Sequence, residues 1–134
     1  AGVSAQSCRA RTSQCMTTKS VQRFGPMGPA LVTADELGDA SGLRIGLRVN
    51  GETLQDSSTG QMIFGVAELI SYLSQFWPVE PGDVIATGTP AGVGFTRTPP
   101  IFLRDGDDVE TFIEGIGVLR NRVVSSGALG GARA

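Results

Sequence analysis

The residues best suited to chemistry lie in one short stretch, Gly88-Thr89-Pro90-Ala91-Gly92. Because glycine has no side chain, Gly88 and Gly92 allow a ligand or another strand to approach the main chain closely. Thr89 adds a hydroxyl that can donate or accept a hydrogen bond. Two interpretations stay open. The stretch is either a strand that ends in a sharp glycine turn, or a small site where Thr89 and main-chain amides hold a carboxylate or an oxyanion.

Lys19 and Ser20 form a second candidate pair. A lysine ammonium is a compact donor whose pKa falls readily on burial, so it can act as a base or form a Schiff base. Taken alone, a lysine before a turn is more often a solvated surface residue. The residues by themselves therefore leave both roles open for Lys19, and Ser20 is the weaker candidate of the two.

Composition excludes several classes of function. The 134 residues contain no histidine, which is the commonest general base and the commonest metal ligand. A net charge of −2 gives no reason to expect nucleic acid or an anionic membrane as a partner, and no apolar run is long enough to span a bilayer. Cys8 and Cys15 have a spacing unlike that of a zinc knuckle, so we expect reduced thiols in a cytoplasmic protein.

A predicted hairpin is the clearest structural pattern. Apolar residues alternate with polar or small ones from Leu43 to Asn50, which is typical of a half-buried strand. Asn50-Gly51 is a preferred two-residue hairpin turn, and Glu52 to Asp56 is the return strand. We expect Arg44 and Arg48 to be solvated residues of an edge strand that discourage pairing with other chains. Carboxylate binding by these arginines is the less favoured alternative.

One amphipathic helix is predicted after Gly65, because apolar residues recur there at spacings of three and four. It ends before Pro78, and Trp77 is expected to close the core at its end. The other predicted elements are a short strand and helical turn over Leu31–Leu37, a buried strand over Asp83–Thr87, a brief strand over Ile101–Leu103, and a second hairpin formed by Val109–Glu114 and Val118–Val124.

The run GDVIATGTPAGVG, which covers Gly82 to Gly94, belongs to a larger ordered set of motifs. The others are Lys19-Ser20, Phe24-Gly25-Pro26, Val49-Asn50-Gly51-Glu52 and Met62-Ile63-Phe64. In this order they resemble the fumarylacetoacetate hydrolase family, and are most similar to its bacterial isomerases and decarboxylases of 2-oxo dicarboxylic acids. The resemblance extends to about Val124.

This resemblance implies a fold and the boundaries of one domain. The fold would be a rolled β-sandwich, mixed but mainly β, with one principal helix. Residues 1–124 would form a single domain that is truncated at its N-terminus relative to the family. Residues 125–134 are rich in glycine, serine and alanine, so we expect them to form a disordered tail.

The family's metal ligands are missing from the matching segment. The family reads D-V-S-A-R-D there, and its first Asp is a metal ligand, whereas this chain has Gly2, with Gln6 and Ser7 in place of the Arg and the second Asp. A Glu-x-Glu pair and a His-Glu dyad lie upstream of this segment in the family. Since magnesium requires several hard oxygen ligands, the Mg²⁺ or Mn²⁺ expected of the family has no predicted ligand here, and we expect no cofactor.

The resemblance also assigns roles to the candidates. The matching lysine of the family faces the carboxylate or oxo group of the substrate, so Lys19 and Thr89 are the predicted catalytic residues. Ser20, Gly88, Thr89 and Gly92 are the predicted substrate-binding residues. The predicted partners are a small carbonyl or carboxylate ligand and, as is common in the family, a second copy in a homodimer.

Three functions remain open from the sequence. The favoured one is a divergent, metal-free enzyme that acts on a small oxo acid or enolisable carbonyl compound by isomerisation, decarboxylation, cyclisation or carbon–carbon cleavage. The second is a non-catalytic relative that serves as a binding or partner subunit. The third is a functionless product, which would leave an apolar face exposed where further chain should pack.

Overall fold

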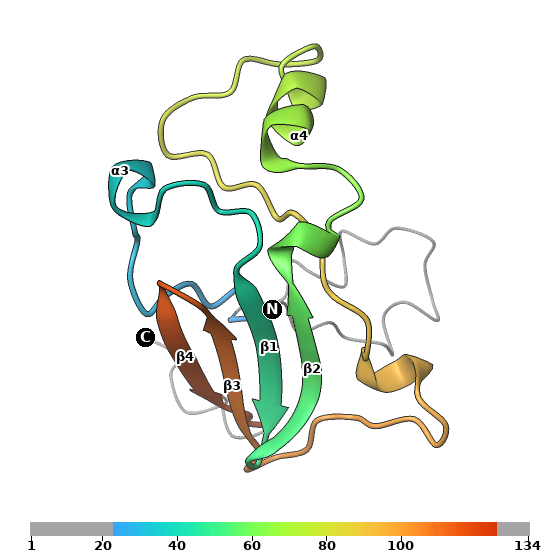
Figure 1. The fold of residues 1–134 in the computed structure, drawn as a ribbon. Coiled ribbons are helices and arrows are strands. Elements are labelled where there is room, and N and C mark those ends of the chain that lie inside the picture. Colours follow the sequence, from blue (N-terminus) through green and yellow to red (C-terminus); the bar gives the residue numbers. More distant parts are fainter. Residues whose placement is uncertain (1–22, 126–134) are drawn as a thin grey trace, which may run out of the picture.

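The computed structural model describes residues 23–125, which are organised around a four-stranded antiparallel sheet (Figure 1). The strand order is β2-β1-β3-β4, formed by β1 (Arg44–Val49), β2 (Glu52–Ser58), β3 (Asp108–Ile113) and β4 (Gly117–Arg122). The helices are α3 (Ala34–Leu37) and α4 (Val66–Leu73), with 3₁₀ turns η1 (Thr59–Gln61) and η2 (Gly94–Thr96). The predicted class, mainly β with one principal helix, is confirmed.

The turn between β1 and β2 forms as predicted. Asn50 and Gly51 have φ angles of 51° and 84°, and two positive values in succession match the twist of a tight hairpin. The Asn50 side chain also ties this turn to the start of β3. Its Nδ2 donates to Asp107 Oδ1 at 2.9 Å, and its Oδ1 accepts from the Asp108 amide at 2.9 Å. The second predicted hairpin is confirmed as β3 and β4.

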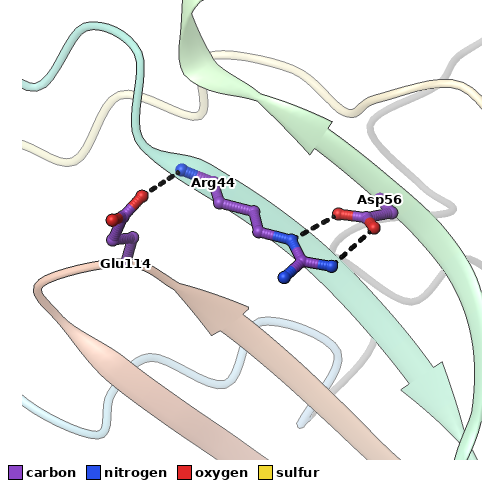
Figure 2. Close-up of polar contacts among 3 residues, drawn as sticks. All are labelled: Arg44, Asp56 and Glu114. Carbon is purple, nitrogen blue, oxygen red and sulfur yellow. Dashed lines mark hydrogen bonds and ion pairs between the residues drawn. The ribbon is translucent and has the colours of Figure 1, made fainter.

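The expectation that Arg44 and Arg48 lie on an edge strand is wrong. β1 is an inner strand between β2 and β3, so its arginines meet carboxylates on both sides. The Arg44 Nε and Nη2 atoms donate to the two carboxylate oxygens of Asp56 at 2.9 and 2.7 Å, and its amide donates to Glu114 at 3.0 Å (Figure 2). Arg48 lies 3.6 Å from the carboxylate of Glu110 on β3.

Replacing Arg44 by methionine is expected to raise the pKa of Asp56 toward its ordinary value. The hydrogen bonds from Arg44 hold that pKa below 3.8, and the charges of Arg44 and Arg48 lower it further. A carboxyl group whose pKa is lowered by folding stabilises the fold at pH values above its pKa in the unfolded chain. This contribution is lost as the pH falls through its pKa in the folded chain. An NMR titration of the carboxyl groups measures the change. Asp107 is the internal control, since Asn50 and the Arg104 amide lower its pKa and neither group is changed. An unchanged pKa of Asp56 would contradict the assignment of its lowered pKa to Arg44.

A β-bulge in β2 changes which side chains face the interior. Leu47 pairs with Gln55 and Arg48 with Thr53, so Leu54 is an extra residue without a partner in the ladder. Beyond the bulge the strand is shifted by one residue, which turns every later side chain to the opposite face. Gln55 is therefore buried, with 7% of its surface exposed, while Asp56 reaches the face that carries Arg44.

Several predicted elements are absent from the described residues. Asp83–Thr87 and Ile101–Leu103 form no strand, and only the helical turn of the Leu31–Leu37 prediction is present, as α3. An extended segment becomes a strand through hydrogen bonds to a neighbour, and none of residues 23–125 supplies such a neighbour for Asp83–Thr87. Trp77 does not close a core, because 52% of its surface is exposed.

The described core is small. Val49 and Val109 face each other across β1 and β3 and are the buried apolar side chains of the sheet. α4 begins after Gly65 as predicted, but none of its residues is buried. Within residues 23–125, α3 and α4 are both too short to cross a membrane, and no other helix there has a membrane-spanning apolar length.

Candidate functional site

The five residues 88–92, here called the Thr89 turn, lie against the bulge of β2. The link is the buried side chain of Gln55. Its Nε2 donates to the carbonyl oxygens of Pro90 at 2.7 Å and Ala91 at 3.2 Å, and lies 3.4 Å from the hydroxyl oxygen of Thr89. A buried amide with several acceptors holds its partners firmly, because an unpaired polar group in this position would lose its solvation without compensation. Gln55 therefore fixes the position of the turn.

Arg97 provides a second connection between the turn and β2. Its Nε donates to the carbonyl oxygen of Gly92 at 3.2 Å, and its Nη2 donates to the carbonyl oxygen of Leu54. Leu54 is the bulge residue, so its carbonyl group has no ladder partner and is free to accept from a side chain. The irregularity in the strand thus provides the acceptor that anchors the far end of the turn.

The two glycines of the turn meet different surroundings. Gly88 and Gly92 have φ angles of 120° and 95°, a region that other residues rarely adopt. A Cβ atom on Gly92 would lie 2.5 Å from Leu54 O and 3.3 Å from Arg97 Nη2, whereas a Cβ atom on Gly88 would meet nothing within 4 Å. The predicted close approach to the main chain is therefore present at Gly92, where the approaching group is β2. Gly88 is open.

The chemistry available to this turn is hydrogen-bond donation from a fixed position. Thr89 is exposed, and at 3.4 Å from Gln55 its hydroxyl is only weakly engaged, so its proton can point to a ligand. Within residues 23–125, the amides of Thr89 and Ala91 donate to no main-chain carbonyl. Such donors suit a carboxylate or a developing oxyanion.

The structure brings together only some of the predicted residues. Gly88, Thr89 and Gly92 share one turn, while Lys19 and Ser20 lie outside the described residues, so their roles stay predictions. Gln55 and Arg97 were not predicted. Simple hairpin pairing from Asn50-Gly51 places Gln55 opposite Gly46 on the open face, and only the bulge moves it inward. The sequence held no signal for this, because β2 is polar at every position except Leu54 and Gln55 does not stand out among its neighbours.

The described residues do not fit a metal site. Between residues 23 and 125, no three side chains of His, Cys, Asp or Glu come close enough together to hold an ion. Several of the acids bind other groups of the chain instead: Asp56 binds Arg44, Asp107 binds Asn50, and Glu110 binds Arg120 at 2.9 Å. The expectation that the chain lacks metal ligands remains a prediction.

One cavity among the described residues lies away from the Thr89 turn. It is an open groove of about 590 Å³, here called the α4 groove, lined by Leu73 and Trp77 near the end of α4 and by residues 78–80 and 83–86. Its walls are mostly apolar, with carboxylates at Glu80 and Asp83. Since it shares no residue with the Thr89 turn, we treat the two as separate features.

Comparison with known proteins gives consistent matches. Residues 2–124 match the sequence profile "Fumarylacetoacetate (FAA) hydrolase C-terminal". The mitochondrial oxaloacetate tautomerase FAHD2A of Bos taurus is 51% identical over 111 residues, which are 83% of this chain and 35% of the bovine protein. The solved structure of fumarylacetoacetate hydrolase from Exiguobacterium antarcticum superimposes with a TM-score of 0.87 at 42% identity, covering 91% of this chain and 44% of that one.

A third relative carries a metal and a small oxo acid. The maleylpyruvate hydrolase from Sphingobium sp. SYK-6, solved in complex with manganese(II) ion and pyruvate, has a TM-score of 0.72 at 34% identity, covering 81% of this chain and 38% of that one. All three matches share one feature. The chain spans less than half the length of each relative.

Proposed function

The chain belongs to the fumarylacetoacetate hydrolase family, and from this premise we propose that it contributes the Thr89 turn to an enzyme acting on a small oxo acid. The reaction class we favour is isomerisation or tautomerisation, which is supported by the relative named as an oxaloacetate tautomerase. The observation that carries the proposal is the double anchoring of the turn by Gln55 and Arg97, which presents Thr89 at the surface. The non-catalytic alternative has less support, since the relatives carry the names of enzymes.

The proposed role of Thr89 is to donate a hydrogen bond from its hydroxyl group to the carbonyl oxygen of the substrate. In a keto–enol conversion the carbon beside the carbonyl group gives up a proton to water, negative charge develops on the carbonyl oxygen, and that oxygen then takes a proton from water. A donor already fixed in position stabilises this charge without reorganising, and removal of one such donor typically slows catalysis by about 10²–10³-fold. Lys19 is proposed as a second group that binds the carboxylate or oxo oxygen.

The metal expected of the family is left out of this mechanism. A manganese(II) ion is present with pyruvate in the Sphingobium enzyme, but residues 23–125 of this chain hold no group of ligands that fits one. No step of the proposal therefore runs through a metal. A homodimer and a cytoplasmic location are further parts of the proposal, and light scattering tests the first.

Ligand binding and turnover of oxaloacetate test the proposal together. We expect pyruvate and oxaloacetate to shift the amide NMR signals of residues 88–92, and we expect faster loss of the enol absorbance of oxaloacetate. Thr89→Val removes the hydroxyl at nearly constant shape and should reduce turnover by about tenfold or more, while Thr89→Ser should retain most of it. Lys19→Ala should abolish turnover.

Two controls make this experiment decisive. Thr53→Val makes the same chemical change on β2, on the other side of the bulge from Gln55, and should leave turnover as in the original chain. Circular dichroism of every variant checks that the fold is intact. The absence of both ligand-induced shifts at the Thr89 turn and enol conversion above the uncatalysed rate would contradict the proposed function.

A further inference from the structure

The hairpin turn between β1 and β2 joins two residues that can react with each other. An asparagine followed by glycine is prone to lose its side-chain amide group, because glycine has no side chain to shield the main-chain nitrogen that attacks it. Gly51 is exposed, and a Cβ atom there would meet nothing within 4 Å. Among residues 23–125, its amide donates to no main-chain carbonyl group. The other asparagine of the chain, Asn121, lies within β4 and is followed by arginine.

The Asn50 side chain, which the Gly51 nitrogen would attack, is held by the start of β3. Its Nδ2 donates to Asp107 Oδ1 at 2.9 Å, and its Oδ1 accepts from the Asp108 amide at 2.9 Å. The Asn50 amide also donates to the carbonyl oxygen of Asp108 at 2.9 Å. Both polar atoms of the side chain are therefore engaged, and the Nδ2 atom that donates to Asp107 is the atom that would have to leave. The contacts with β3 oppose the reaction.

From these observations we propose that Asn50 is a site of deamidation, and that its bonds to Asp107 and Asp108 slow the reaction while the chain is folded. The Gly51 nitrogen loses its proton to hydroxide and forms a bond to Asn50 Cγ. The Cγ–Nδ2 bond then breaks, and Nδ2 leaves as ammonia with a proton taken from water, which produces a cyclic imide. Water opens the imide at either carbonyl group and gives aspartate or isoaspartate. Overall, water is consumed, ammonia is released, and nothing is oxidised or reduced.

The product of this reaction would separate the hairpin turn from β3. A carboxylate at position 50 would face Asp107 Oδ1, to which Asn50 Nδ2 now donates at 2.9 Å. Asp107 is charged at neutral pH, because hydrogen bonds from Asn50 and from the Arg104 amide lower its pKa. Two carboxylates at this distance repel each other. The repulsion would loosen the end of the sheet where Val49 and Val109, its buried apolar pair, lie next to the turn.

The proposal does not depend on the function assigned to Thr89. The side chain of Asn50 bonds to Asp107 and Asp108, whereas the Thr89 turn is held by Gln55 and Arg97. The two sets of contacts share no residue. Deamidation at Asn50 would therefore be observed whether or not the chain turns over an oxo acid.

Incubation of the purified chain in mildly alkaline buffer tests the site, with peptide mapping by mass spectrometry to measure the conversion of each asparagine. We expect Asn50 to convert at least about tenfold more slowly in the folded chain than in the same chain in guanidinium chloride, because reaction in the fold requires local opening. Asp107→Ala removes the acceptor of Asn50 Nδ2 and should accelerate conversion in the folded chain by about tenfold. Asn121 is the internal reference and should stay unconverted under both conditions.

The matched control is Asp108→Ala, which removes the neighbouring carboxylate but keeps the main-chain amide that donates to Asn50 Oδ1. This variant should convert as slowly as the original chain, and circular dichroism verifies the fold of both variants. A second measurement uses Asn50→Asp, which supplies the product directly and should raise the pKa of Asp107 in an NMR titration.

Three results would overturn the proposal. Equal conversion of Asn50 in the folded and denatured chains would show that the contacts with β3 do not slow the reaction, and this comparison decides even if Asp107→Ala fails to fold. A folded Asp107→Ala chain that converts as slowly as the original would remove the role of Asp107. Conversion of Asn121 as fast as that of Asn50 would contradict the assignment of the site to Asn50 and Gly51.

Discussion

Replacing Gln55 by glutamate is expected to detach the Thr89 turn from the sheet at neutral pH. The substitution keeps the size of the side chain but exchanges the donor Nε2 for a carboxylate oxygen. That oxygen would face the carbonyl oxygens of Pro90 and Ala91, at positions where the amide now donates at 2.7 and 3.2 Å. Loss of a buried donor that leaves its partners unpaired costs about 1–3 kcal/mol, and more when a charge is buried. Urea denaturation measures the loss, and amide exchange at residues 88–92 locates it.

The same variant has a diagnostic pH dependence. A buried carboxylate beside carbonyl oxygens has its pKa raised above the unfolded value of about 4.3. The protonated acid can donate to the carbonyl oxygen of Pro90. The stability of the variant relative to the original chain should therefore be fully recovered only at pH values below the pKa of the glutamate in the unfolded chain. It should be lost as the pH rises through the raised pKa of the glutamate in the folded chain. Gln61→Glu makes the same change at an exposed position of η1 and should show neither effect. A Gln55→Glu variant as stable as the original at pH 7 would refute the role assigned to Gln55.

Replacing Gly92 by alanine should destabilise the chain more than replacing Gly88 by alanine. Both positions have positive φ, and a residue with a side chain costs about 1–3 kcal/mol there. Gly92→Ala adds a collision, since its Cβ atom would lie 2.5 Å from Leu54 O, whereas that of Gly88→Ala has open space around it. Overpacking of this kind costs a further amount of about 1–3 kcal/mol.

The comparison of the two variants isolates the contact with β2, because both pay the same kind of free-energy cost for a side chain at positive φ. Thermal or urea unfolding of both variants under the same conditions gives the difference in free energy of unfolding. Amide exchange at Leu54 and Gln55 should increase in the Gly92→Ala variant alone. Equal destabilisation by the two substitutions would mean that the turn does not press against the bulge.

Local patterns predicted the parts of the fold that depend on local interactions. Asn50-Gly51 defines its own turn, and alternation from Leu43 to Asn50 defines the strand beside it, so this hairpin was predicted correctly. Segments that need a distant partner were predicted less well. Asp83–Thr87 has the residues of a strand but no partner among residues 23–125, and the position of Arg44 on an inner strand depends on β3, which lies more than fifty residues later.

In the candidate site, too, local patterns predicted some residues and missed those whose position depends on a distant contact. Gly88, Thr89 and Gly92 were chosen as candidates because their residue types are informative; they lie on one anchored turn, and their roles stay predictions. The anchors were missed because the bulge at Leu54 cannot be read from alternation. A regular strand would have turned Gln55 to the open face and Asp56 away from Arg44, so one extra residue decides both the buried amide and the ion pair.

The bulge also affects how this sheet behaves toward other molecules. Among residues 23–125, β2 is an outer strand of the sheet, and outer strands with free carbonyl groups recruit further strands and promote aggregation. At Leu54 the carbonyl group already accepts from Arg97, and the irregular spacing breaks the row of acceptors that an incoming strand would need. The residues that hold the Thr89 turn in place thus also protect this edge of the sheet from fibril-like growth.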